Sequence, residues 1–146
     1  MNRLASVFLL VVLLGGCKKQ EQTPDPDLTV GMEGTFNMVQ VYLNRGTNQQ
    51  VTYSPADSAQ TASITIKKLA NSKVEVKTLL QRRNGQMIIN STFEGTLSVD
   101  SGLSTRINIT GADQANNGYY HQEANSLLLD LNGAGSGNSR IIAQKK

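Results

Sequence analysis

The chain has 146 residues, with 14 Lys and Arg against 11 Asp and Glu, and a formal net charge of +3 at pH 7. This near-balance argues against a nucleic-acid-binding protein, for which a basic patch or stripe is expected. The sequence holds one histidine and one cysteine. That excludes a zinc site built from histidines and cysteines, because such a site uses three or four of these ligands.

Residues 1–16 have the layout of a secretory signal peptide. A short start with one positive charge, Arg3, is followed by the apolar run LASVFLLVVLL over residues 4–14 and by two glycines. A helix that spans a bilayer needs about 20 apolar residues. Lys18 ends this run too early, so we predict a cleaved signal and not a membrane-spanning helix.

The motif Leu14-Gly15-Gly16-Cys17 closes this segment and resembles the lipobox of bacterial lipoproteins. The resemblance implies cleavage before Cys17 and lipidation of its thiol, and therefore a membrane as partner. Two or more acyl chains hold a protein at a bilayer stably, whereas one chain holds it only marginally. Lys18, in place of an aspartate, implies the outer membrane of the cell envelope, with the periplasmic or surface-facing leaflet left open. A disulfide at Cys17 is excluded because there is no second cysteine.

Residues 17–27 are predicted to be the lipidated cysteine and a flexible tether. The segment is polar, and Pro24 and Pro26 alternate with aspartates, so it has little apolar surface to bury. The ten residues 18–27 reach at most ~33 Å when fully extended at ~3.3 Å each. We therefore expect the tether to hold the following domain away from the lipid.

Residues 28–146 are predicted to form a single domain of antiparallel β-strands. Apolar and polar side chains alternate along four runs, residues 61–67, 72–83, 86–99 and 126–132, although Leu128 breaks the last alternation. A period of two is typical of strands with one buried face and one exposed face. With a last strand over residues 140–144, the spacing predicts eight to ten strands.

Turn residues separate these runs. Asn84-Gly85 is the strongest of these signals, because this dipeptide readily adopts the positive φ angles of a tight hairpin. Single helical turns are expected over residues 57–59 and 112–115. Further turns are expected at Asn71-Ser72, Asp100-Ser101-Gly102, Asn116-Asn117-Gly118 and residues 132–139.

The long run over residues 86–99 favours a barrel. As one flat strand it would be ~46 Å long, whereas strands usually have about 3–10 residues. It must therefore bend, and Gly95 in its middle is where a bend or bulge would lie. Long, bent antiparallel strands suit a small closed barrel. The alternative is an antiparallel β-sandwich.

Gly34-Thr35-Phe36, at the start of the first strand, resembles the opening motif of the small lipocalin-like lipoproteins of Bacteroidota-type bacteria. In that family a glycine, any residue and a tryptophan follow the lipobox and a polar spacer, and Phe36 here takes the place of the tryptophan. The resemblance implies an all-β fold, an antiparallel up-and-down lipocalin-like (calycin) barrel around a cavity or a packed core. It implies no shared catalytic residues.

The alternation also selects side chains that face the interior. They would either surround a small apolar ligand or fill the core, and small barrels are often packed solid. These candidates are Phe36, Met38, Ile64, Ile66, Val74, Val76, Ile89, Phe93 and Leu129.

Tyr119-Tyr120-His121 form a candidate ligand-binding rim, because tyrosine combines an apolar ring with a polar tip. The alternative is an ordinary strand in which one tyrosine packs inward and its neighbour faces water.

No pattern of nucleophile, base and orienting group accompanies His121, the only histidine, so we expect neither an enzyme nor a bound cofactor. The first hypothesis is a membrane-anchored binding module for a small hydrophobic ligand or an envelope protein. The alternative is a structural or assembly lipoprotein with a filled core and no small-molecule ligand.

Overall fold

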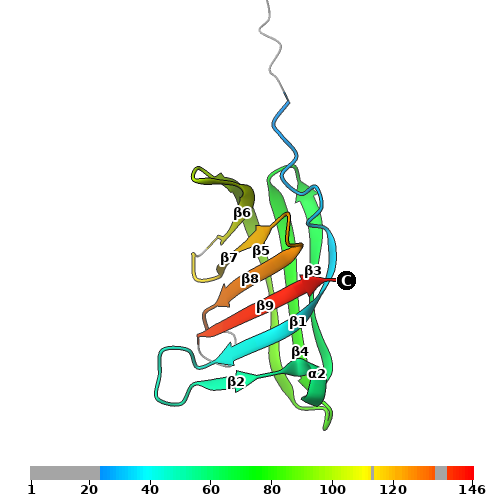
Figure 1. The fold of residues 1–146 in the computed structure, drawn as a ribbon, viewed down its shortest axis with the longest axis vertical. Coiled ribbons are helices and arrows are strands. Elements are labelled where there is room, and N and C mark those ends of the chain that lie inside the picture. Colours follow the sequence, from blue (N-terminus) through cyan, green and yellow to red (C-terminus); the bar gives the residue numbers. More distant parts are fainter. Residues whose placement is uncertain (1–23, 113, 134–137) are drawn as a thin grey trace, which may run out of the picture.

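A closed antiparallel β-barrel forms the body of the protein (Figure 1). The computed structural model describes residues 24–112, 114–133 and 138–146. In these residues the strand order is β2-β1-β3-β4-β5-β6-β7-β8-β9, and β1 also pairs with β9, which closes the sheet. The predicted barrel is therefore confirmed, and the sandwich alternative is wrong. The strands are β1 (Gly34–Leu43), β2 (Val51–Tyr53), β3 (Ala59–Ala70), β4 (Lys73–Arg82), β5 (Met87–Asp100), β6 (Leu103–Gly111), β7 (Asn117–His121), β8 (Ser126–Leu131) and β9 (Ser139–Lys145).

Eight of these strands make the closed circuit, and β2 is a short addition to it. β2 pairs with the end of β1, beyond the point where β3 pairs with the start of β1. The helical turn α2 (Pro55–Ser58) lies between β2 and β3. A helical turn was expected over residues 57–59, and in the structure it begins two residues earlier, at Pro55. The helical turn predicted over residues 112–115 is wrong for the residues that the structure describes. Residue 112 belongs to a non-helical turn, and residues 114 and 115 form bends.

The alternating sequence pattern explains which side chains form the core. Along β4, the buried positions alternate with more exposed ones from Val74 to Leu80. Along β8, every second residue is buried in the same way. Inside the barrel the rings of Phe36 and Tyr120 meet edge to face, with their centroids 5.9 Å apart. Burial of one face of each strand thus produces a single continuous core.

Gly95, where a bend or bulge was predicted, is the point at which the longest strand changes its neighbour. The first part of β5 pairs with β4, and pairing with β6 begins at Gly95, which is opposite both Val74 and Gly111. An added Cβ at Gly95 would lie 2.6 Å from Cγ2 of Ile109. Glycine therefore permits the close packing at the point where β5 exchanges one neighbour for the other. The register is continuous here, so there is no bulge at Gly95.

Two turn predictions need correction. Asn84-Gly85 does join β4 to β5, but of these two residues only Gly85 has a positive φ, 85°. The amide of Arg82 donates to Gln86 O, and that of Gly85 donates to Arg82 O, which makes a three-residue loop in place of a two-residue turn. Asn117-Gly118 is not a turn, since both residues belong to β7.

The predicted tether is held against the barrel at its end. Residues 1–23, with the predicted signal peptide and Cys17, lie outside the described residues. The side chain of Asn71 donates to Asp25 O, and Asn71 O accepts from the amide of Leu28. Asp27 forms an ion pair with Lys68. The last residues of the predicted tether, Asp25 and Asp27, therefore contact the barrel. No helix among the described residues is long and apolar enough to cross a bilayer.

Candidate functional site

The predicted interior residues lie in the core, with one exception. Eight of the nine are at most 5% exposed, namely Phe36, Met38, Ile64, Ile66, Val74, Val76, Ile89 and Leu129. Phe93 is only partly buried against this core. Phe93 lies in the first half of β5, where a strand lies on one side only, but Ile89 in the same half is fully buried.

The predicted rim is wrong for one of its three residues. Tyr120 is 1% exposed and belongs to the core. Its hydroxyl lies 3.0 Å from Gly31 O and 2.9 Å from Asn125 Oδ1, and burial raises the pKa of the phenol. Tyr119 and His121 are half-buried on the opposite, outward side of β7. The alternative, with one tyrosine inward and its neighbour outward, is confirmed.

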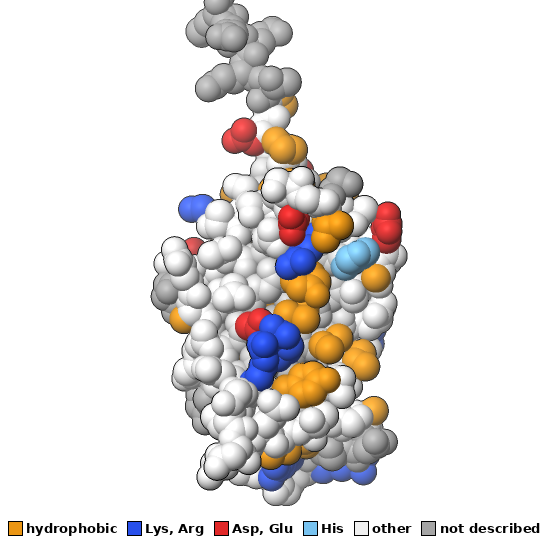
Figure 2. Space-filling model, turned by 60° about the vertical axis from the view of Figure 1, so that its left-hand side comes forward, with side chains coloured by type: hydrophobic (Ala, Val, Ile, Leu, Met, Phe, Trp, Pro, Cys, Tyr) orange, Lys and Arg blue, Asp and Glu red, His pale blue; other side chains and the backbone are white. Residues whose placement is uncertain are grey.

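Three pockets lined by described residues lie on the outer surface of the barrel, with volumes of about 320, 350 and 280 Å³. They are lined mainly by residues of β6 to β9 and of the segment that follows β1, with Tyr42 of β1 and Ser98 of β5. Figure 2 shows hydrophobic and basic side chains gathered along a band on one face of the molecule. We refer to the outward residues Arg45, Arg106, Tyr119, Leu128, Asp130 and Arg140 as the outer face.

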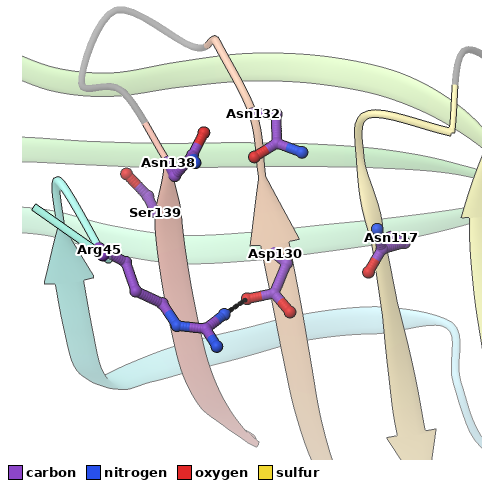
Figure 3. A pocket seen from close by; sticks show the side chains of 7 residues that line it. Arg45, Asn117, Asp130, Asn132, Asn138 and Ser139 are labelled. Atoms are coloured by element: carbon purple, nitrogen blue, oxygen red, sulfur yellow. Dashed lines mark hydrogen bonds and ion pairs between the residues drawn. The ribbon is translucent and has the colours of Figure 1, made fainter.

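Asp130 on β8 is the centre of the outer face. Arg140, its cross-strand neighbour on β9, donates from Nε and Nη2 to the two carboxylate oxygens, each at 2.7 Å. This hydrogen bonding raises the pKa of the Arg140 guanidinium. Arg45 reaches the same carboxylate from the loop after β1, with Nη1 3.1 Å from Oδ1 (Figure 3). Two guanidinium groups on one carboxylate leave a net positive charge here.

Apolar and aromatic groups adjoin this cluster. Ile142, Leu128 and Tyr119 are cross-strand neighbours on β9, β8 and β7. The guanidinium carbon of Arg106 lies 3.8 Å from the centroid of the Tyr119 ring, which is a cation–π arrangement. Leu128, the residue that breaks the alternation in the sequence, is thus an outward residue that lines two of the pockets.

The outer face combines hydrogen-bond donors with apolar surface. Its polar groups are mainly guanidinium donors with amide side chains around them. His121 Nδ1 is 3.4 Å from the amide nitrogen of Ala124, which donates to it. Among the described residues no group of three or more His, Cys, Asp or Glu side chains could hold a metal ion. The arrangement therefore offers charge-assisted hydrogen bonds and an apolar contact surface.

Sequence reasoning did not find the arginines of this site. Arg45 and Asp130 are 85 residues apart in the chain, and only the closure of β1 on β9 brings them together. The one local signal was Leu128, an apolar residue at an outward position.

The chain matches no protein-family model and no curated protein sequence. Among solved structures it is similar to a redesigned β-barrel, at 12% identity and a TM-score of 0.48, over 85% of this chain and 99% of that one. It is also similar to a de novo designed fluorescence-activating β-barrel, at 11% identity and a TM-score of 0.43, over 82% and 98% of the two chains. At these values the likeness carries no functional information.

Proposed function

We propose that this protein is a non-catalytic, membrane-anchored lipoprotein of the cell envelope that binds another envelope protein through its outer face. The observation that carries the proposal is the clustering of Arg45, Arg140 and the Arg106–Tyr119 pair around Leu128. Arginine and tyrosine are enriched in the residues that dominate protein–protein binding energy. An apolar patch with a polar surround is the usual anatomy of such an interface.

The lipobox around Cys17 supports anchoring in the membrane, and Lys18 supports the outer membrane as its location. Acylation at Cys17 would place the barrel within a tether's length of the bilayer, where envelope proteins are the accessible partners. The proposal does not specify whether the protein is anchored in the periplasmic or the surface-facing leaflet of that membrane.

The burial of the interior supports a protein partner over a small apolar ligand. Side chains such as Phe36, Ile64 and Leu129 are fully buried and pack together as one core. A ligand of drug size usually occupies a pocket of about 300–1,000 Å³ that buries most of its surface. The pockets described above have volumes near the lower end of this range, but they lie on the outside of the barrel and not in its core, where they suit contact with another protein surface.

A photo-crosslinking amino acid at Leu128, in the full chain in bacterial membranes, tests the proposal. We expect one discrete envelope-protein adduct, lost in Arg140→Ala. The matched control carries the crosslinker at Thr65, an exposed position on β3. The proposal is wrong if position 128 gives no more adduct than position 65.

Two further measurements separate the parts of the proposal. Incorporation of a labelled fatty acid, lost in Cys17→Ser, tests the anchor independently of the partner. Native mass spectrometry tests whether the interior of the barrel holds a small ligand. Added mass that disappears on denaturation would show an occupied barrel and favour the small apolar ligand.

A further inference from the structure

Four exposed apolar side chains gather at one end of the barrel, which we call the tether end. Val30, Leu69, Val99 and Leu103 are 66%, 44%, 51% and 52% exposed. They belong to the segment before β1, to the end of β3 and to the two strands that meet in the β5–β6 turn. Figure 1 shows this end at the top of the view, where the described chain begins. A group of exposed apolar residues, unlike single ones, indicates a surface that contacts something else.

The β3–β4 turn joins the segments that carry these side chains. Asn71 O accepts from the amide of Leu28, and Ser72 O accepts from the amide of Leu97, each at 2.8 Å. Leu28 lies two residues before the exposed valine of the segment before β1, and Leu97 lies two residues before the exposed valine of β5. The apolar side chains therefore surround one turn and belong to one surface.

The segment before β1 presents its valine to the outside although its neighbours are buried. Thr29 and Met32 are 2% and 0% exposed. The amide of Met32 donates to Thr29 O at 2.9 Å, and Gly31 has a φ of 79°, as in a type II turn. Val30 occupies the second position of this turn. The same turn that buries its neighbours thus holds the valine outside.

The chain between this end and the proposed anchor is short. Residue 24 is the first that the structure describes, and Cys17 precedes it by seven residues. Seven residues span at most ~25 Å. Contacts of residues 25–33 with the barrel therefore leave a shorter link than the ten residues counted from the sequence alone. The tether end is consequently the part of the barrel nearest to the acylated cysteine.

We infer that the tether end rests on the bilayer surface, with its four apolar side chains in the boundary between headgroups and acyl chains. The inference rests on the anchor at Cys17, which is part of the proposed function. Apolar groups of peripheral proteins enter this boundary to a depth of about 5–10 Å. The acyl chains supply most of the affinity, and the side chains fix the orientation of the barrel. The outer face, on the side of the barrel, then remains accessible to a partner.

The charges of the tether end favour apolar insertion over electrostatic attraction. Residues 25–33, 68–73, 97–106, 121–126 and 145–146 carry five basic and five acidic side chains. The bases are Lys68, Lys73, Arg106, Lys145 and Lys146, and the acids are Asp25, Asp27, Glu33, Asp100 and Glu123. Because these charges balance, salt has no net attraction to screen. We therefore expect the contact with lipid to be the same at low and high salt.

Fluorescence quenching by lipid tests the contact. The full acylated chain carries an NBD fluorophore on Val99→Cys and is reconstituted in phosphatidylethanolamine–phosphatidylglycerol vesicles that contain a nitroxide-labelled lipid. The matched control is Met87→Cys, because Met87 is 45% exposed and lies at the other end of the same strand. We expect quenching to be several-fold stronger at position 99 than at position 87. Acylation blocks the thiol of Cys17, so only the introduced cysteine takes up the fluorophore.

A pair of double variants tests the role of the apolar side chains. With the fluorophore at position 99, Val30→Asp/Leu69→Asp is expected to reduce quenching to the level seen at position 87. Val39→Asp/Val51→Asp is the matched control and should leave quenching unchanged, since Val39 and Val51 are 55% and 50% exposed on β1 and β2. All four valines and leucines are exposed, so the fold tolerates both variants alike.

The inference alone is overturned if the acylated chain shows equal quenching at positions 99 and 87, or if the two double variants do not differ. Loss of quenching at high salt also overturns it, because electrostatic attraction would then hold the barrel. Protection of position 99 from aqueous iodide without quenching by lipid would mean that a protein or a second copy covers this end, against the inference. Uptake of the fluorophore by the unmodified chain would show a free Cys17 and would overturn the anchor together with the inference.

Discussion

At the scale of single residues, Thr78 is the interior position that departs most from an apolar core. The alternation of β4 directs its side chain inward, and it is 0% exposed. Its hydroxyl oxygen has no hydrogen-bond partner in the structure, although Ser91 is its cross-strand neighbour on β5. Leaving a buried polar group without a partner costs about 1–3 kcal/mol.

We expect Thr78→Val to raise the free energy of unfolding by about 1 kcal/mol, because the valine has nearly the same shape and no unsatisfied hydroxyl. The measurement is the urea midpoint at unchanged slope. Thr65→Val, at an exposed position on β3, is the control and should change stability little. A lower midpoint for Thr78→Val would show that the hydroxyl has a stabilising partner.

At the scale of elements, glycines determine how closely the strands pack. An added Cβ at Gly118 in β7 would lie 2.1 Å from the backbone oxygen of Leu128 in β8. The sequence pattern Asn117-Gly118 indicated a turn, since asparagine and glycine favour turns. The structure shows the other use of a strand glycine, which is to admit a neighbouring backbone. The two uses look the same in sequence because both require the absence of a side chain.

Gly118→Ala is expected to lower the free energy of unfolding by about 1–3 kcal/mol, the usual cost of overpacking. The backbone of Leu128 cannot move away without disturbing its pairing with β9. Gly102→Ala is the matched control, because the nearest atom to its added Cβ is 3.6 Å away, on the half-buried side chain of Asp100. Equal stabilities of the two variants in a denaturant titration would contradict this explanation.

At the scale of the whole molecule, the segment before β1 closes one end of the barrel. Met32 is fully buried, and Gly31 O lies next to both the Tyr120 hydroxyl and the ammonium group of Lys145 near the C-terminus. Asp27 anchors the start of this segment. Hydrogen bonds from Lys68 and Thr29 lower the pKa of its carboxyl from 3.8 to about 2.

Because this pKa is lowered in the folded state, the docking of the segment is strengthened at pH values above 3.8 and the effect is lost as the pH falls through about 2. The Thr29 amide donates to Asp27 Oδ1 at 3.0 Å, so its NMR chemical shift should report the titration with a midpoint near 2. In Lys68→Met the midpoint should move up toward 3.8, since the strongest contribution is removed. An unchanged midpoint would exclude Lys68 as the cause.

The sequence alone determined which side chains face inward, because burial of one face imposes a period of two on each strand. It also indicated where most strands end and singled out Gly95, where β5 changes its neighbour. The tertiary structure decided the rest. The pairing of β1 with β9 separates a barrel from a sandwich, and it is made by residues about 100 positions apart, such as Met38 and Ala143. Inward alternation is the same in both folds, so local sequence cannot distinguish them.

The candidate site and the free edge of β5 depend on the same long-range pairing. Arg45, Asp130 and Arg140 meet only because the strand register aligns them, and β5 has a neighbour on one side only before Gly95 because its pairing with β6 begins there. Register is set by the packing of the whole core and the geometry of distant turns. A sequence pattern records the face of each side chain, whereas its cross-strand neighbour is a property of the folded barrel.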